Sequence, residues 1–342
     1  MNEIFNVAVL GSSGYVGMEL VKLLNNHPNV NINFLGSETV TNEYLTNIDG
    51  SKVYEKLPKL EKNISFNPNE SDCVFLALPH SVSNIYVKKF YGKLKIIDLS
   101  ADFRLDNIEN YNQFYGNNHN CSNLLNDFIY GLAEINRNQI LSSKNIAIPG
   151  CYPTSILLPL IPLLKNNLIT NENIIIDSKS GYSGAGKKYD LSNIKSNKEY
   201  NFYNYNTNSH RHVSEIKQEL SKYSKDKKIN FSFNPHILPN FRGMMSTIYC
   251  DLNNNVKIDN IIETLKNFDE LNTFIKLIDT NDRLDFFSIK NTNFCKIKIF
   301  KHYNENKIIL VSAIDNLIKG AAGQAVQCLN ISENLDETKS LL

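Results

Sequence analysis

The opening of the chain carries the pattern that most restricts its fold: an apolar run, a glycine-rich turn and a helical run, in that order. Residues 4–10 have the composition of a buried strand, and residues 18–24 have the spacing of a helix. Between them, "GSSGYVG" places glycines at Gly11, Gly14 and Gly17. Such glycines allow a tight turn, a close approach of a ligand to the backbone and close packing of the helix on the strand. The pattern predicts the first strand and helix of a doubly wound parallel sheet.

The same turn predicts a site for the pyrophosphate of a dinucleotide. A helix that starts at such a turn directs backbone N–H groups at an anion. A strand, glycines and a helix in sequence are more specific evidence than glycine spacing alone. We assign cofactor contacts in this turn to Gly11, Ser13, Gly14, Tyr15, Val16 and Gly17.

A second apolar strand at 30–35 leads to the position where a dinucleotide's ribose is usually read. There, Glu38 is placed to accept the 2′-hydroxyl of NAD, and Ser37 is placed to bind the 2′-phosphate of NADP. The residues alone leave both readings open. We expect Ser37 to face the ribose and Glu38 to face solvent. Further apolar runs at 73–78 and 94–99 are typical of parallel strands covered on both faces.

Length and composition restrict the other possibilities. A chain of 342 residues predicts two domains. The net charge of +1 gives no electrostatic reason to expect a nucleic acid or an anionic membrane as partner. No apolar run approaches the roughly 18 residues that span a bilayer, and no basic segment with a cleavage site precedes the first strand. The six cysteines lack paired spacing. We therefore expect a cytoplasmic protein without a disulfide framework or a metal site.

One of these cysteines has a distinctive setting. Cys151 lies in "AIPGCYPTS", between a Pro-Gly pair and Pro153, and an apolar run at 156–161 follows. That order predicts a turn that leads into a helix. A thiol at a helix N-terminus meets backbone N–H groups and the positive end of the helix dipole, which stabilise the thiolate. We therefore predict that Cys151 is a nucleophile rather than an apolar core residue.

Polar motifs follow this cysteine. A strand at 173–179 precedes a loop at 180–188 whose glycines, serines and two lysines offer N–H groups and positive charge to an anion. Next come His210 and His212, which point to different faces and are poor joint metal ligands. One of them suits acid–base chemistry on a thiol adduct, because its pKa lies near neutrality. From the residues alone, Glu215 is equally a helix-start carboxylate and a site residue.

The end of the chain adds strands and a close-packed helix. Apolar runs at 231–233, 244–250 and 309–314 predict strands. The small residues of 315–326 predict a helix that packs very closely on a neighbour. Together with a dinucleotide fold, a helix-start cysteine and a histidine describe one chemistry: a thiolate attacks an activated acyl carbon, and a nicotinamide hydride reduces the resulting thioester.

At this point a family resemblance becomes specific. The blocks "GSSGYVGMEL", "ALPHSVS", "DLSADFRL", "YGLAE", "PGCYPTS", "SGYSGAGKK", "HRHVSEI", "FNPHILPNFRGMMSTIY" and "IDNLIKGAAGQAVQ" occur in that order over almost the whole chain. They resemble the N-acetyl-gamma-glutamyl-phosphate reductases, a family of the semialdehyde dehydrogenase superfamily.

The resemblance implies a fold and an activity. The fold is a Rossmann-type domain over residues 1–150, which the closing helix of 315–342 joins, and an α+β catalytic and dimerisation domain with a large mixed sheet over 151–314. The activity is the NADPH-dependent reduction of N-acetylglutamyl 5-phosphate, a small-molecule acyl phosphate, to the 5-semialdehyde in arginine biosynthesis. A homodimer or homotetramer is implied as well.

The resemblance also implies roles for individual residues. Cys151 is the nucleophile and His210 the acid–base group, with His212 as the other candidate for that role. Substrate contacts fall on Arg211, His212, Glu215 and Ser183, and further cofactor contacts fall on Ser37, Gly184 and Asn316.

Four departures from the family pattern affect details. Lys187 stands where an arginine is common, Ser214 and Ala133 replace prolines, and no arginine follows Ser37, which weakens the NADP assignment over NAD. Related alternatives are reductases of aspartyl phosphate, whose cysteine block differs from Gly-Cys-Tyr-Pro-Thr, and of a carrier-linked aminoadipyl phosphate. A nucleotide-sensing protein without catalysis would not need Cys151 and His210, and a cysteine hydrolase would leave the glycine turn unexplained.

Overall fold

The computed structural model describes residues 4–116, 119–196 and 199–342. Within them the chain forms two compact units, Met1–Gly150 with Ala321–Leu342, and Cys151–Gly320. Residues 315–320, which we expected to return to the first domain with the closing helix, belong to the second unit. The last α-helix begins only at Gly323.

The first unit contains a parallel sheet of seven strands in the order β3-β2-β1-β4-β5-β7-β6. The strands are β1 (Phe5–Leu10), β2 (Val30–Gly36), β3 (Leu60–Glu61), β4 (Cys73–Leu76), β5 (Lys95–Asp98), β6 (Ile129–Tyr130) and β7 (Asn145–Ala147). The helices are α1 (Tyr15–Asn25), α2 (Leu45–Asp49), α3 (Ser83–Phe90), α4 (Ile108–Tyr115), α5 (Ala133–Leu141) and α9 (Gly323–Ser332). The strand order reverses beside β1, which is the arrangement of a doubly wound sheet.

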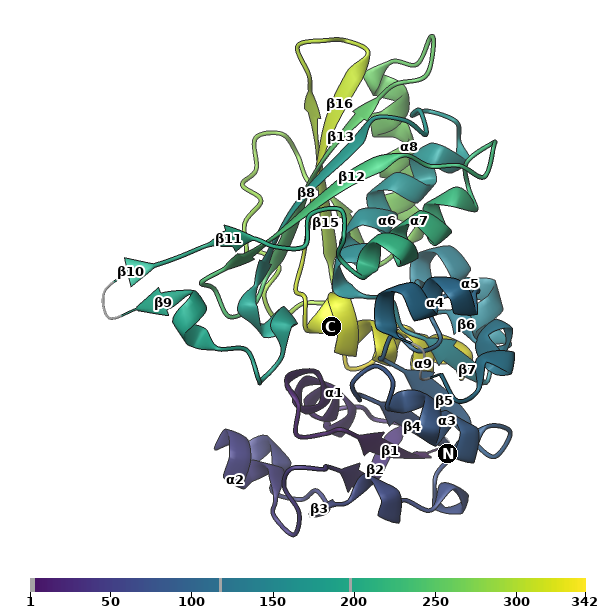
Figure 1. The fold of residues 1–342 in the computed structure, drawn as a ribbon, viewed down its shortest axis with the longest axis vertical. Coiled ribbons are helices and arrows are strands. Elements are labelled where there is room, and N and C mark those ends of the chain that lie inside the picture. The colour runs from purple at the N-terminus through teal and green to yellow at the C-terminus, as the bar shows by residue number, and fades with distance from the viewer. Residues whose placement is uncertain (1–3, 117–118, 197–198) are drawn as a thin grey trace. The chain divides into compact units, whose positions relative to one another are not determined.

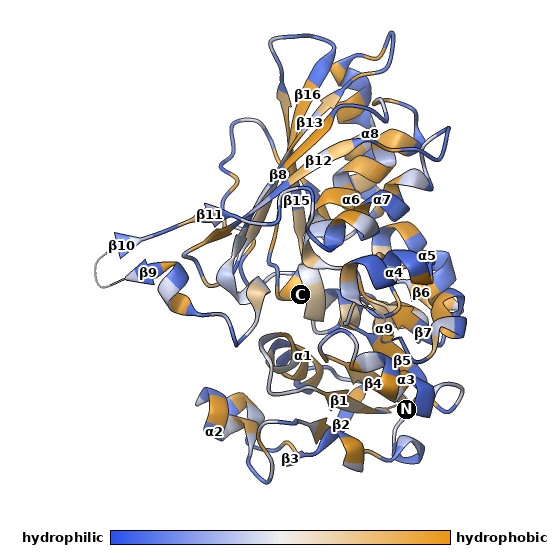
Figure 2. Cartoon of the chain, in the orientation of Figure 1, coloured by the Kyte–Doolittle hydropathy of each residue, from blue (hydrophilic) through white to orange (hydrophobic). Residues whose placement is uncertain are grey.

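Both faces of this sheet are buried, as the continuous apolar runs predicted. Side chains alternate along β1: Val7 and Val9 belong to a cluster with residues of α1, α5 and α9, while Ala8 and Leu10 join α3 on the other face. Strand β4 is buried at every position, and the strands at the centre of the sheet are mostly apolar (Figure 2). A strand covered on both sides has no polar face, which explains why its sequence does not alternate.

The second unit contains a mixed sheet of seven strands in the order β11-β12-β8-β13-β16-β15-β14. The strands are β8 (Ile174–Gly181), β11 (Tyr203–Asn204), β12 (Phe231–Leu238), β13 (Met244–Asp251), β14 (Ile275–Leu277), β15 (Cys295–Lys301) and β16 (Lys307–Ile314). Short strands β9 (Lys195–Ser196) and β10 (Glu199–Tyr200) pair with each other and project from this sheet (Figure 1). The two sheets confirm the predicted fold class.

Three helices lie on one face of the mixed sheet: α6 (Cys151–Lys165), α7 (His212–Ser221) and α8 (Ile258–Leu271) (Figure 1). Helix α6 packs directly on β13, β15 and β16, and it also contacts α7 and α8. A π-helical turn, η7 (Ile318–Ala322), carries the chain from the second unit back to the first. π-Helical turns are rare in proteins, and those that occur often lie at functional sites.

The packing around the first helix explains why Gly11 and Gly17 must be glycine. Gly11 has a φ of 80°, which favours glycine, and a Cβ there would lie 2.2 Å from the carbonyl oxygen of Ala77. A Cβ on Gly17 would lie 2.2 Å from the carbonyl oxygen of Gly11. On Gly14, by contrast, the nearest atom would be the Gly11 oxygen at an ordinary 3.5 Å.

We therefore expect Gly17→Ala to destabilise the first unit by about 1–3 kcal/mol, the usual range for overpacking. Gly14→Ala is the matched control, with an expected change within about 0.5 kcal/mol. Urea unfolding followed by circular dichroism measures both. Equal unfolding midpoints for the two variants would contradict the steric argument.

Candidate active site

The start of α1 has the features of an anion-binding site, because its N-cap residue has no side chain to cap the backbone N–H groups. Gly14 is the N-terminal residue that precedes α1, and it makes no side-chain cap. The N–H groups of Gly11 and Ser12 are bonded to the carbonyl of Gly36 at the end of β2, which fixes the turn against the sheet. An unsubstituted Cα at Gly14 leaves room for phosphate oxygens beside the helix start, so the turn fits a dinucleotide pyrophosphate.

The end of β2 differs in detail from our expectation of a serine directed at the ribose. Ser37 is fully buried, and its hydroxyl lies 2.8 Å from that of Ser13 in the glycine turn. It also accepts the N–H groups of Thr39 and Val40. Glu38 is exposed, as expected. The Tyr86 hydroxyl nevertheless lies 3.5 Å from the Glu38 carboxylate.

Buried carboxylates, which the sequence analysis did not single out, organise the loop after β4. Asp102 accepts hydrogen bonds from the Ser81 N–H and the Tyr111 hydroxyl, both at 2.7 Å, and two from Asn84 at 2.9 Å. Ser81 has a φ of 65°, so these bonds hold an uncommon backbone conformation. Burial, followed by the charge of Asp102, raises the pKa of Asp98 to about 6. Asp98 and Asp102 both belong to the block "DLSADFRL", and this block was the feature of the sequence that could have identified them.

Cys151 lies where the sequence predicted it. It is the first residue of α6 and is partly exposed, whereas Tyr152 and the following residues of the helix are buried. The other five cysteines are buried. Cys151 is thus the accessible thiol, and its position at the helix start favours the thiolate.

His210 lies beside the start of the same helix. Its ring centroid is 5.5 Å from that of Tyr152, the residue after the cysteine. The ring nitrogen Nδ1 accepts the backbone N–H of His212 at 3.1 Å, and Nε2 lies 3.5 Å from the hydroxyl of Tyr205. Burial, and secondarily the charge of Arg211, lowers the pKa of His210 to about 4. The imidazole is therefore neutral at pH 7.

Two tyrosines that the sequence analysis missed extend this contact. The Tyr205 hydroxyl donates to Tyr152 at 3.3 Å, and the Tyr152 hydroxyl donates to the His236 carbonyl at 3.3 Å. Burial raises the pKa of Tyr205 to about 12, so its proton is retained. Because Nδ1 of His210 already accepts a backbone N–H, the remaining proton sits on Nε2 and completes a directional chain. Tyr205 lies in an asparagine-rich connection without a motif.

The other residues of the histidine block take different positions. His212 is buried and begins α7, and its ring centroid is 4.8 Å from that of His210. Arg211 is exposed and precedes the helix. Glu215 is buried in the first turn of α7. The block therefore brings His210 and His212 together, while Arg211 points to solvent.

The side-chain amide of Asn316, close to the end of the second unit, connects the loop after β8 with the start of β13. Asn316 donates to the Ser183 hydroxyl at 2.9 Å and accepts the Gly243 N–H at 2.8 Å. A Cβ on Gly184 would lie 3.8 Å from the same amide nitrogen. Ser183, Gly184 and Asn316, which the sequence analysis grouped as cofactor and substrate contacts, are thus neighbours.

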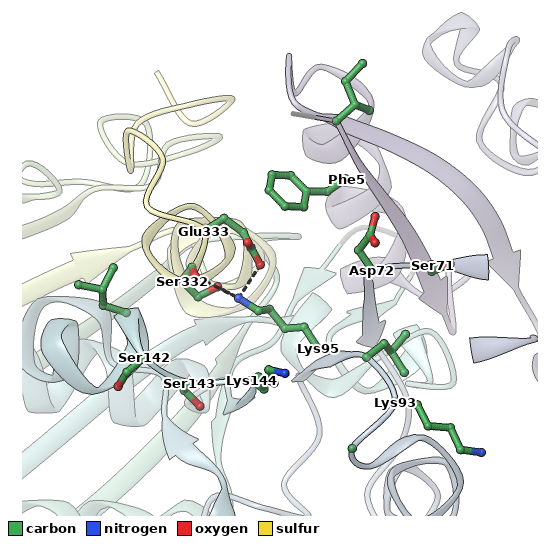
Figure 3. A pocket seen from close by; sticks show the side chains of 14 residues that line it. Phe5, Ser71, Asp72, Lys93, Lys95, Ser142, Ser143, Lys144, Ser332 and Glu333 are labelled. Carbon is green, nitrogen blue, oxygen red and sulfur yellow. Dashed lines mark hydrogen bonds and ion pairs between the residues drawn. The ribbon is translucent and has the colours of Figure 1, made fainter. Parts of the chain in front are cut away.

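A cavity of about 550 Å³ occupies a different part of the first unit. It is lined by residues at the amino-terminal ends of β1, β4 and β5, among them Phe5, Asp72 and Lys95 (Figure 3). The glycine turn follows the other, carboxyl end of β1. Inside the cavity, the Lys95 ammonium contacts the Glu333 carboxylate at 2.5 Å and the Ser332 hydroxyl at 2.7 Å. Ligands of open α/β sheets bind at the carboxyl ends of the strands, so this cavity is separate from the cofactor turn.

Within residues 4–116, 119–196 and 199–342, no three His, Cys, Asp or Glu side chains are grouped as a metal site would require. None of the helices in the same ranges has the length and apolarity to cross a membrane.

Two family models match this chain, and each of them corresponds to one of the two units. Residues 6–143 match the model of the semialdehyde dehydrogenase NAD binding domain, and residues 151–316 match that of the semialdehyde dehydrogenase dimerisation domain. Among solved structures, an aspartate semialdehyde dehydrogenase II from Vibrio cholerae has a TM-score of 0.75 at 17% identity, covering 97% of this chain and 99% of that one. The enzyme from Candida albicans, solved with NADP, has a TM-score of 0.69 at 17% identity and covers 97% and 99%. These likenesses show the fold.

Curated relatives are more similar in sequence. A probable chloroplastic N-acetyl-gamma-glutamyl-phosphate reductase of Arabidopsis thaliana is 40% identical, over 98% of this chain and 84% of its own length. The N-acetyl-gamma-glutamyl-phosphate reductase of Caldicellulosiruptor saccharolyticus is 43% identical, over 98% of this chain and 97% of its own. That of Ehrlichia ruminantium is 42% identical, over the same shares. With near-complete coverage at this identity, the chain belongs to the N-acetyl-gamma-glutamyl-phosphate reductase family.

Proposed function

We propose that this enzyme reduces N-acetyl-L-glutamyl 5-phosphate to N-acetyl-L-glutamate 5-semialdehyde and phosphate, with NADPH, in arginine biosynthesis. The observation that carries the proposal is the partly exposed Cys151 at the first position of α6, with the neutral His210 beside the same helix start. The family assignment selects the acyl group, and the site supplies a nucleophile for it.

In the first step the sulfur of Cys151 attacks the acyl carbon. The bond from that carbon to the phosphate oxygen breaks, phosphate leaves, and a thioester remains on the enzyme. The start of α6 stabilises the attacking thiolate through its N–H groups and dipole. When bound, the dihydronicotinamide supplies the hydride that reduces the thioester carbon. Collapse of the reduced adduct then releases the aldehyde and returns the thiolate.

His210 acts on the acyl oxygen in this proposal. The His212 N–H occupies Nδ1, so a neutral His210 carries its proton on Nε2. That N–H donates to the oxygen on which negative charge develops in both tetrahedral adducts. Tyr205 orients the ring through the same nitrogen when substrate is absent. Arg211, His212, Glu215 and Ser183 contribute to substrate binding around this centre.

In the same proposal, cofactor-binding residues come from both units and the catalytic residues come from the second. The first unit holds the dinucleotide through Gly11, Ser13, Gly14, Tyr15, Val16, Gly17 and Ser37. The second contributes Gly184 and Asn316 to the cofactor, together with the catalytic residues. Because residues 151–316 match a dimerisation domain, we further propose a homodimer or homotetramer assembled through the second unit. The enzyme is proposed to act in the cytoplasm.

Replacing the nucleophile tests the covalent mechanism. Cys151→Ser is expected to abolish turnover while leaving NADPH binding within about twofold, because serine is the poorer nucleophile and the glycine turn is unchanged. Oxidation of NADPH at 340 nm measures turnover, and cofactor fluorescence measures binding. Normal turnover in this variant would rule out the thioester.

Replacing each histidine tests the assignment of His210. His210→Asn is expected to lower kcat by roughly a hundredfold to a thousandfold, the usual cost of removing one hydrogen-bond donor to a developing oxyanion. His212→Asn is the comparison, and we expect it to act mainly on KM, because its backbone N–H remains. A severe loss in kcat for His212→Asn with a mild one for His210→Asn would reverse the two roles.

Cofactor choice tests the end of β2. We expect a higher kcat/KM with NADPH than with NADH, with a preference weaker than an arginine-bearing site gives, because a carboxylate close to a phosphate is repelled by it. Glu38→Ser should then strengthen the NADPH preference, whereas Glu43→Ser, which removes an exposed carboxylate elsewhere in the unit, should not. A preference for NADH that Glu38→Ser reverses would identify Glu38 as the ribose-binding residue.

A further inference from the structure

Gly320 packs directly against the proposed nucleophile. A Cβ added to Gly320 would lie 2.8 Å from the Cβ of Cys151 and 3.3 Å from its Cα. The third neighbour would be Ile314 Cδ1 at 3.3 Å, so the sulfur is not among the three nearest atoms. The φ of Gly320 is not positive, and the backbone conformation alone would accept alanine. Glycine is required here for space.

A buried carboxylate fixes the turn that carries Gly320. Asp315 is fully buried and accepts the N–H groups of Leu317 at 2.9 Å and Ile318 at 3.2 Å through one oxygen. Its other oxygen accepts the Asn291 N–H at 2.7 Å and lies 3.4 Å from Nε of Arg242. The Gly320 N–H donates to the Asp315 carbonyl at 3.0 Å.

The turn that carries Gly320 and the body of helix α6 have no room to retreat. Lys319, the neighbour of Gly320, is fully buried, and its ammonium lies 5.7 Å from the centre of the Phe274 ring. On the other side, α6 is buried from Tyr152 to Leu164. A methyl group at position 320 would therefore be absorbed by Cys151, the one residue of the contact at a partly exposed helix end.

We propose that Gly320 is a positioning residue for the nucleophile: its bare Cα, held by Asp315, sets the position of the Cys151 side chain at the start of α6. This inference rests on the proposed nucleophilic role of Cys151. Gly320 packs against Cα and Cβ of the partly exposed Cys151, so the contact fixes the bond from which the sulfur projects. Misplacement of a reacting group by about 1 Å costs on the order of a hundredfold in rate.

The test is Gly320→Ala, measured with two readouts. We expect kcat to fall about tenfold to a hundredfold with KM nearly unchanged. We also expect alkylation of Cys151 by iodoacetamide, followed by peptide mass spectrometry, to slow about tenfold, since the thiol leaves the helix start. Unchanged kcat and unchanged alkylation would overturn the proposal.

Gly131→Ala is the matched control. A Cβ there would lie 2.9 Å from Ile146 Cγ2 and 3.1 Å from Ile148 Cδ1, a comparable clash in the first unit. It is expected to lower the melting temperature without slowing alkylation of Cys151. Equal slowing in both variants would reduce the effect at Gly320 to general destabilisation and overturn the proposal.

A second variant covers the case in which Gly320→Ala does not fold. Asp315→Asn keeps the size of the side chain and weakens the bonds that hold the turn, so a smaller loss of kcat with slowed alkylation supports the proposal, and unchanged alkylation overturns it. Failure of the proposed function has a different signature. In that case the unaltered enzyme would not reduce the acyl phosphate, or Cys151→Ser would remain active, whatever the alkylation rates are.

Discussion

The burial of helix α6 is the constraint on which the second unit depends. Every side chain from Tyr152 to Leu164 is buried, between the mixed sheet and helices α7 and α8. The helix nevertheless contains Pro159 and Pro162, and an interior proline costs about 3 kcal/mol. Burial of each large aliphatic side chain contributes about 1.5–3 kcal/mol, so the long apolar run outweighs that cost. A helix held in this way presents its first residue, Cys151, at a fixed place.

The proposed catalytic centre of the second unit combines this helix start with uncharged polar groups. Burial keeps His210 neutral, and the chain through Tyr205 and Tyr152 ends on a backbone carbonyl, so each proton has a defined acceptor. The arrangement assigns charge stabilisation to the helix and hydrogen-bond donation to the histidine.

Much of this could be predicted from local sequence. The glycines before α1 and the proline-flanked Cys151 are contiguous motifs whose meaning depends on a few neighbouring residues. The buried strands were predicted from apolar runs, because a parallel sheet covered on both faces has no polar side. Tyr205 was missed because it lies in a segment without a motif and one of its partners, Tyr152, is 53 positions away. Gly320 was missed because it meets Cys151 only through the fold of the whole unit. Residues 315–320 cluster with the second unit, where Asp315 is held by Arg242 and Asn291.

The sequence by itself determined the fold class and the family, and it predicted the thiol and the histidine block as site residues, because these follow from short patterns and contiguous blocks. Only the tertiary structure decided which nitrogen of His210 carries the proton, that Ser37 is buried against Ser13, and that Gly320 must lack a side chain. Each of these depends on a distance between atoms of separate segments. Such distances are fixed by packing of the whole unit, and no local pattern of residue types encodes them.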